Sequence, residues 1–171
     1  RNVELGYQLA TEKNVFTSNI YYRTTTDKIE QRLWIEEDEK IHTSFHNDCS
    51  DKSLGLELMG NFELTPWWSL NANTNLYHYT IEGKVFEDPF KESMFSWSAQ
   101  LVNSFTIAEA TSIQLIGYYN SETIMSQGTL SDFYFVDVAV KQQFFKGKLS
   151  LSLQCKDILQ SMNYQLKTEN G

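Results

Sequence analysis

Residues 53–79 constrain the fold of this chain most, because they form two alternating segments that fold back on each other around residues 64–68. Alternate positions of the first arm carry Leu54, Leu56, Leu58, Phe62 and Leu64. Successive side chains of a strand point to opposite faces, so these apolar residues share one face. The period is that of a β-hairpin and cannot be that of an amphipathic helix.

The same alternation recurs along the whole chain and predicts an all-β fold, an antiparallel up-and-down meander of about eight strands. Tight turns are expected near positions 12, 66, 109 and 146. Within residues 15–35 the apolar positions change from even to odd near residues 24–27, which predicts a β-bulge there.

Three polar stretches, residues 36–51, 82–92 and 122–132, are predicted to be long loops. Short turns then alternate with long loops, as in a membrane barrel with short periplasmic turns and long outer loops. The chain has no run of about eighteen apolar residues, so we expect no membrane helix.

The composition of the 171 residues excludes some partners. A formal charge of -8 argues against a nucleic-acid surface, which would need clustered Lys and Arg. The two cysteines, Cys49 in a predicted loop and Cys155 in a predicted strand, are expected to be free thiols.

The side chains at the polar positions of the strands indicate whether the polar face of the sheet contacts bulk water or the lumen of a barrel. A soluble strand usually shows Lys, Glu or Arg to water, whereas the lumen of a large barrel can be lined by small uncharged groups. Glu57 and Glu63 are charged exceptions in the first arm of the hairpin. Most of the other polar positions carry small uncharged side chains: Ser69, Asn71, Asn73, Asn75, Ser96, Ser98, Gln100, Ser104, Ser150, Ser152 and Gln154.

Aromatic residues recur near both ends of the predicted strands. Trp68 and Tyr79 lie roughly 36 Å apart along a strand, which a tilt of about 45° projects to roughly 26 Å, close to the apolar band of an outer-membrane barrel. Strands also favour aromatic residues in general. The aromatic residues predicted to form two interfacial girdles are Trp67, Trp68, Tyr77, Tyr79, Phe95, Trp97, Phe105, Phe133, Phe144 and Phe145.

Six short motifs, in order over nearly the whole chain, carry a family resemblance. They are residues 2–7 (NVELGY), 19–23 (NIYYR) with 27–29 (DKI), 53–58 (SLGLEL), 67–71 (WWSLN), 127–128 (QG) with 136–137 (VD), and 148–151 (KLSL) with 157–158 (DI). Together they resemble the C-terminal barrel part of TonB-dependent outer-membrane receptors, in the form common in Bacteroidetes.

The resemblance implies a location in the outer membrane of a Gram-negative cell, in a barrel of roughly twenty-two strands. Residues 1–171 are then expected to be one partial domain that lacks the plug, the earlier strands and the last strands, and to form an open sheet when isolated. The implied function is the barrel wall of a receptor that takes up a scarce ligand such as an iron chelate, a glycan or a peptide. The implied partners are outer-membrane lipid, the plug with the remaining strands, TonB acting through the plug, and a surface lipoprotein.

No catalytic constellation, metal site or cofactor site is expected, so the chain is not predicted to be an enzyme. His42, His46 and Cys49 lack a fourth metal ligand, and the acidic residues 36–39 are explained equally well by a solvated loop as by calcium binding. The candidate ligand-contact residues all lie in the predicted loops: Glu36, Asp38, His42, His46, Asp48, Glu87, Asp88 and Glu122.

An alternative from another class stays open at this point. A chain of this length with about eight strands also has the size of a complete small barrel that binds one hydrophobic ligand, as lipocalins do.

Overall fold

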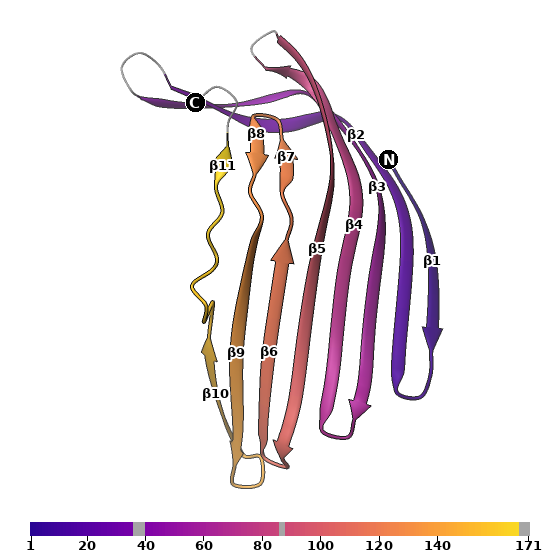
Figure 1. Ribbon diagram of the computed structural model, residues 1–171, viewed down its shortest axis with the longest axis vertical. Helices are drawn as coiled ribbons and strands as arrows, with labels where there is room; N and C mark the ends of the chain where they lie inside the picture. The colour runs from indigo at the N-terminus through magenta and orange to yellow at the C-terminus, as the bar shows by residue number, and fades with distance from the viewer. Residues whose placement is uncertain (36–39, 86–87, 168–171) are drawn as a thin grey trace.

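The computed structural model describes residues 1–35, 40–85 and 88–167, and it is all-β (Figure 1). An eight-stranded antiparallel sheet follows chain order, which confirms the predicted meander. Its strands are β1 (Asn2–Ala10), β2 (Asn14–Ile35), β3 (Ile41–Thr65), β4 (Trp68–Val85), β5 (Asp88–Ala108), β6 (Thr111–Asn120), β9 (Phe133–Phe144) and β10 (Leu149–Cys155). A second, three-stranded sheet holds β7 (Thr123–Met125), β8 (Gly128–Leu130) and β11 (Leu166–Lys167).

The hairpin of residues 53–79 is confirmed. Ser53 pairs with Tyr79 and Thr65 pairs with Trp68, so β3 and β4 run beside each other over the full predicted length. The four predicted tight turns are present too, and Figure 1 shows them together at the lower end of the sheet. This lower end is called the turn end below, and the opposite end the outer end.

The predicted bulge near residues 24–27 is also confirmed. The pairing of β2 with β3 shifts between Thr25 and Lys28, and it shifts again between Lys28 and Glu30. Asp27 has a φ of 53°, the left-handed conformation that some bulges require. Beyond the bulge, β2 and β3 bend away from the other strands at the outer end (Figure 1).

The prediction of three long loops is wrong for most of their described residues. β3 begins at Ile41, β4 continues to Val85, β5 begins at Asp88, and a β7–β8 hairpin occupies part of residues 122–132. Residues 36–39 and 86–87 lie outside the described residues. Charged residues do not exclude a strand here, because strands that continue beyond the apolar region can carry charges and pair them across the ladder.

The register separates the sheet into two faces. The apolar face holds alternate residues that pair across the strands, among them the neighbours Ile20, Leu56, Leu76 and Trp97. Its side chains stay open to the surroundings, with Leu5 74% and Leu153 75% exposed. The polar face holds the intervening residues, such as Asn73 and Gln100. Soluble proteins rarely expose a continuous apolar patch of this extent.

The main sheet is not closed. In the part of the chain that the structure describes, β1 and β10 are its two edge strands and do not pair with each other. The small closed barrel considered from chain length is therefore contradicted, because its apolar residues would have to be enclosed. The described residues include no helix that is long and apolar enough to cross a membrane.

The polar face is packed locally around Tyr21, which is buried. Its hydroxyl donates a hydrogen bond to Asn75 Oδ1 at 3.1 Å, and its ring lies over Gly55. A Cβ added at Gly55 would stand 2.4 Å from the tyrosine ring, whereas a Cβ added at Gly117 would meet nothing within 4 Å. Gly55 therefore leaves the space that the Tyr21 ring needs.

We predict that Gly55→Ala destabilises the protein by about 1–3 kcal/mol, because the Tyr21 ring must move and lose its partner Asn75. Gly117→Ala is the matched control, since it makes the same change in an open place and lowers the chain entropy of the unfolded state. Urea titration of the purified protein measures both. Equal stabilities for the two variants would contradict this account of Gly55.

Candidate functional site

Aromatic side chains gather at the turn end of the apolar face. Trp67 in the β3–β4 turn, Trp68 and Phe105 stack on one another, with ring centroids 6.0–6.2 Å apart. The indole of Trp68 donates a hydrogen bond to Asn103 Oδ1 at 3.1 Å. Phe144 and Phe145 lie at the same end, where β9 turns into β10. These five predicted girdle residues thus share one level.

A second aromatic level crosses the apolar face towards the outer end. Phe95 and Trp97 of β5 belong to it, and the Trp97 ring lies 4.6 Å from the ring of Tyr119. Tyr22 and Tyr134 also lie on this face, by their pairing with Leu54 and Tyr119. Tyr22, Tyr119 and Tyr134 were missed as girdle residues, although their parity in the alternating pattern could have identified them.

Three of the predicted girdle residues lie on the wrong face for that role. Tyr77 pairs with Ser96, Tyr79 with Ser53 and Phe133 with Asn120, all positions of the polar face. Distance along a strand gives the height of an aromatic residue, whereas parity gives its face. Since neighbouring residues of a strand point to opposite sides, these three residues cannot lie on the same face as Phe95 and Trp97.

The polar face is a hydrogen-bonded surface with few charges. Asn71 donates to Asn61 Oδ1 at 2.6 Å, and Gln114 donates to Ser104 Oγ at 3.2 Å. Near β1, Arg23 forms an ion pair with Glu4 at 3.1 Å and lies 3.6 Å from Glu57. A face of this kind can bind polar partners or water.

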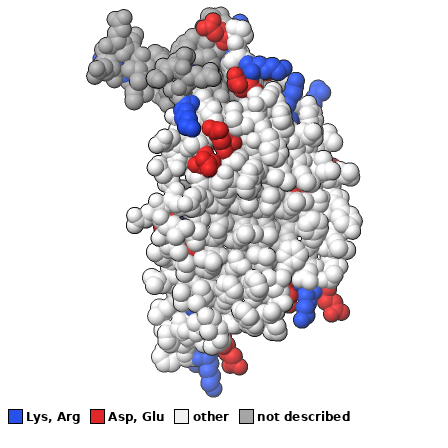
Figure 2. All heavy atoms as spheres, viewed as in Figure 1, with Lys and Arg blue, Asp and Glu red and all other residues white. Residues whose placement is uncertain are grey.

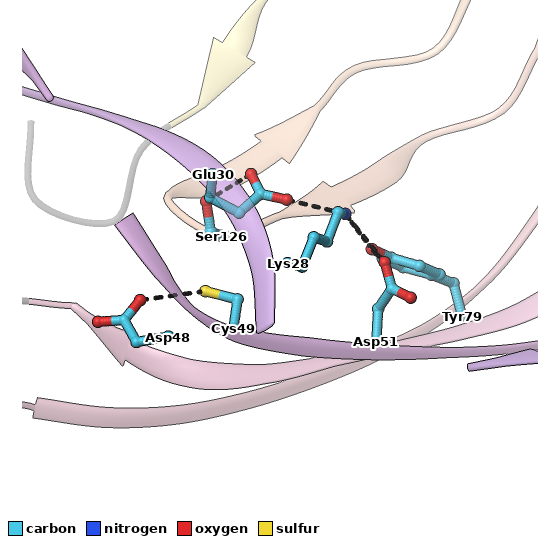
Figure 3. Close-up of polar contacts among 7 residues, drawn as sticks. All are labelled: Lys28, Glu30, Asp48, Cys49, Asp51, Tyr79 and Ser126. Atoms are coloured by element: carbon cyan, nitrogen blue, oxygen red, sulfur yellow. Dashed lines mark hydrogen bonds and ion pairs between the residues drawn. The ribbon is translucent and has the colours of Figure 1, made fainter. Parts of the chain in front are cut away.

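An ion cluster lies where the bulge of β2 meets the polar face (Figure 3). Lys28 Nζ lies 2.8 Å from Glu30 Oε1 and 3.0 Å from Asp51 Oδ2. The same ammonium donates to the Tyr79 hydroxyl at 2.9 Å, and that hydroxyl donates to Asp51 at 3.0 Å. The bulge brings Lys28 into this cluster because it changes which β2 residues face inward.

The β7–β8 hairpin covers part of the polar face beside this cluster. Ser126, between the two strands, donates to Glu30 Oε2 at 3.2 Å, and Ser96 of β5 donates to the Glu122 carbonyl at 2.8 Å. Ile124 is buried in the contact. A cavity of about 240 Å³ remains, and its lining residues are Lys28, Glu30, Tyr77, Tyr79, Ile81, Thr123, Ile124 and Met125.

The contacts within the ion cluster change the pKa values of Lys28 and Asp51. Burial disfavours the Lys28 ammonium, but hydrogen bonds to Glu30, Tyr79 and Asp51 outweigh that effect and raise the pKa of Lys28. Burial likewise disfavours the Asp51 carboxylate, and hydrogen bonds from Lys28, Thr25 and Tyr79 outweigh it and lower the pKa of Asp51. Both groups are therefore charged at neutral pH and hold the outer parts of β2 and β3 together.

The outer part of β2 is held to its neighbours a second time by Arg32, a buried residue. Its guanidinium donates to the Asp48 carboxylate and to the Lys84 carbonyl. Cys49 is fully buried beside it, and burial raises the pKa of this thiol. Both cysteines are free, as predicted, but Cys49 lies in β3 and not in a loop.

The candidate ligand-contact residues do not form one cluster among the described residues. His42, His46 and Asp48 lie in β3, Asp88 begins β5, and Glu122 lies between β6 and β7. Glu36, Asp38 and Glu87 lie outside the described residues. Within the described part of the chain, no three His, Cys, Asp or Glu side chains are placed to hold a metal ion. Sequence reasoning missed the cluster of Lys28, Glu30 and Asp51, because Asp51 lies on another strand, far along the chain from Lys28 and Glu30.

We predict that Lys28→Met opens the outer part of β2 and β3, because Glu30 and Asp51 lose the ammonium that they share. In a Cys155→Ser background, a water-soluble thiol reagent should then label the buried Cys49 about tenfold faster, as expected for ~1–2 kcal/mol of lost local stability at a partly exposed ion pair. Lys13→Met, in the β1–β2 turn, is the control. An unchanged labelling rate in Lys28→Met would show that the cluster does not hold this region closed.

Comparisons with known proteins give one informative match. No curated protein matches the chain. No solved structure matches it either. The model of a family described as "Outer membrane protein beta-barrel family" matches residues 1–171, the whole chain. The two-faced antiparallel sheet with aromatic residues at two levels agrees with that description. This chain belongs to the outer membrane protein beta-barrel family.

Proposed function

We propose that this chain is part of the barrel wall of a TonB-dependent receptor, which imports a scarce ligand across the outer membrane of a Gram-negative bacterium. The observation that carries the proposal is the open eight-stranded sheet with one exposed apolar face and one largely uncharged polar face. Eight strands that remain open suit a wide barrel better than a small closed one.

Family membership implies an outer-membrane location and a role in the barrel wall. The spacing of the aromatic levels fits that role. Trp68 lies at one level, and His78, paired with Phe95, lies at the other. Ten residues of strand rise roughly 34 Å, and a tilt of about 45° projects this to roughly 24 Å, close to the apolar band of outer-membrane barrels. The apolar face between the two levels then meets lipid.

The polar face then faces the lumen. Its amide and hydroxyl groups, including Asn61, Asn71 and Gln114, offer hydrogen bonds to a polar plug without requiring countercharges. The edges of β1 and β10 are suited to pairing with further strands of the same barrel. In this proposal TonB acts on the plug and not on the wall.

The outer end supplies surfaces for the imported ligand. The bent parts of β2 and β3 and the β7–β8 hairpin meet over the polar face through Glu30 and Ser126. In the proposal they lie at the outer mouth, where His42, His46, Asp48 and Glu122 are the candidate contact residues for a ligand or for a surface lipoprotein. We propose no enzymatic activity, because the charged groups of the Lys28 cluster are held in fixed ion pairs. We propose no nucleic-acid partner, because the chain is acidic.

If the apolar face meets lipid and the polar face meets the lumen, a lysine introduced at the same height should destabilise the protein more on the apolar face. Leu58 and Asn73 lie near mid-height on neighbouring strands, on the apolar and the polar face respectively. Leu58→Lys should destabilise the membrane-inserted protein by about 2–4 kcal/mol, whereas Asn73→Lys should be tolerated. Urea titration in lipid vesicles measures both. A larger cost for Asn73→Lys would reverse the assignment of lipid and lumen.

The transport proposal is tested with the full-length protein in its own bacterium. Uptake of labelled ferric chelates, oligosaccharides and peptides is compared between cells with and without this protein, and with and without functional TonB. We expect one ligand class to enter only when both are present. Entry that needs the protein but not TonB would show a passive pore, and it would overturn the receptor proposal while leaving the barrel wall intact.

A further inference from the structure

A polar strip crosses the apolar face directly beyond its outer aromatic level. The last apolar row includes Tyr22, Leu54 and Phe95. Two residues further along each strand, the ladder aligns Thr24, Lys52, Thr80 and Ser93 as cross-strand neighbours, and the next row aligns Ser50, Glu82 and Lys91. These seven residues are called the headgroup strip. They lie on the side that faces lipid in the proposed orientation and not on the lumen side.

The charges of the strip are unbalanced. Lys91 Nζ lies 3.0 Å from Glu82 Oε2, and Lys52 Nζ lies 3.8 Å from Glu82 Oε1, so two ammonium groups share one carboxylate. The side chains of Lys52 and Lys91 are 52% and 65% exposed and still available to a ligand. A local excess of positive charge is notable in a chain whose formal charge is -8.

The strip also offers neutral hydrogen-bond donors. The hydroxyls of Thr80 and Ser93 lie 3.0 Å apart, so one can donate to the other while the second donates outward. A groove of about 560 Å³ begins at the next row of the strip, where Ser50 and Glu82 line it together with Asp48, Gly83, Lys84 and Pro89. Two ammonium groups and a pair of hydroxyls are suited to an anionic group, and the adjoining groove gives room for sugars attached to it.

The height of the strip identifies the source of that anion. The two rows of the strip lie two and four residues of a tilted strand beyond the aromatic level, roughly 5 Å and roughly 10 Å above it, which places the strip among lipid headgroups and not in the hydrocarbon. Figure 2 shows the same arrangement on one face of the molecule, where charged side chains gather towards the ends and the broad middle is nearly free of them. Anionic headgroups attract Lys and Arg at this depth.

We infer that the headgroup strip binds the phosphate of a phosphorylated glycolipid in the outer leaflet. Phosphate oxygens accept hydrogen bonds from Lys52, Lys91 and a strip hydroxyl, and the sugars of the headgroup enter the adjoining groove. Glu82 holds the lysines when no lipid is bound and competes with the phosphate. This inference rests on the proposed orientation of the apolar face, but it does not depend on TonB or on the imported ligand.

The test uses the full-length protein in phosphatidylcholine nanodiscs, with diphosphoryl lipid A as the probe and dephosphorylated lipid A as its neutral counterpart. Lipid retained on the protein is counted by native mass spectrometry. We expect preferential retention of the phosphorylated lipid, weakened about tenfold by the double variant Lys52→Gln/Lys91→Gln at low salt. Lys52→Arg/Lys91→Arg should keep the preference, because it keeps both charges.

Two further variants separate this inference from a general effect of charge. Glu82→Gln removes the competing carboxylate and should strengthen retention, whereas a loss of strip structure would weaken it. Lys146→Gln/Lys148→Gln, in the β9–β10 turn, makes the same charge change at the other end of the sheet and should leave retention unchanged.

Three results would overturn the inference: equal retention of the two lipids, no loss in Lys52→Gln/Lys91→Gln, or displacement of the lipid by excess inorganic phosphate alone, which would indicate a site for free phosphate. Failure of the protein to enter phosphatidylcholine nanodiscs at all would instead overturn the proposed orientation. The two failures are therefore distinguishable.

Discussion

The continuous antiparallel ladder is the constraint on which the rest of this structure depends. Within a lipid bilayer no water can satisfy backbone N–H and C=O groups, so each strand must pair with its neighbours along its whole membrane length. The hairpin of β3 and β4 meets this requirement from Ser53–Tyr79 down to Thr65–Trp68 with one irregularity near the turn. Once the ladder is in place, parity alone decides which side chains meet lipid.

The bulge in β2 changes that parity at one end of the sheet. Before the bulge, odd-numbered residues such as Tyr21 and Arg23 lie on the polar face. After the bulge, the even-numbered Lys28 lies on that face. Lys28 then meets Asp51 and Tyr79 of the neighbouring strands. The result is a fixed set of charges at the outer end, joined through Glu30 to the β7–β8 hairpin, which is nearly a hundred residues further along the chain.

The local elements of the fold could be predicted well. Leu54, Leu56 and Leu58 show an unambiguous period of two, and Pro66 marks the turn between the arms, because both signals act over a few residues. The bulge was visible as a change of phase between Tyr22 and Ile29. Charged stretches were misread as loops, since the outer ends of β3, β4 and β5 carry polar residues on strands that have left the apolar region.

The candidate site was predicted less well, because its members meet across strands. Tyr79 was assigned to an interfacial girdle on spacing alone, yet its hydroxyl lies between Lys28 and Asp51 on the opposite face. Glu122 was expected to contact a ligand, yet its carbonyl accepts a hydrogen bond from Ser96 and its carboxylate pairs with Lys167. No local pattern marks such contacts.

The sequence by itself determined the apolar parts of the strands, their tight turns and their two faces, since a period of two and the turn residues are local properties of the chain. Only the tertiary structure decided which charges pair, that Cys49 is buried, that the β7–β8 hairpin folds over the polar face, and that Lys52 and Lys91 share Glu82 beyond the aromatic level. Those contacts depend on the register between strands and on the bulge, which align residues that are distant in the chain.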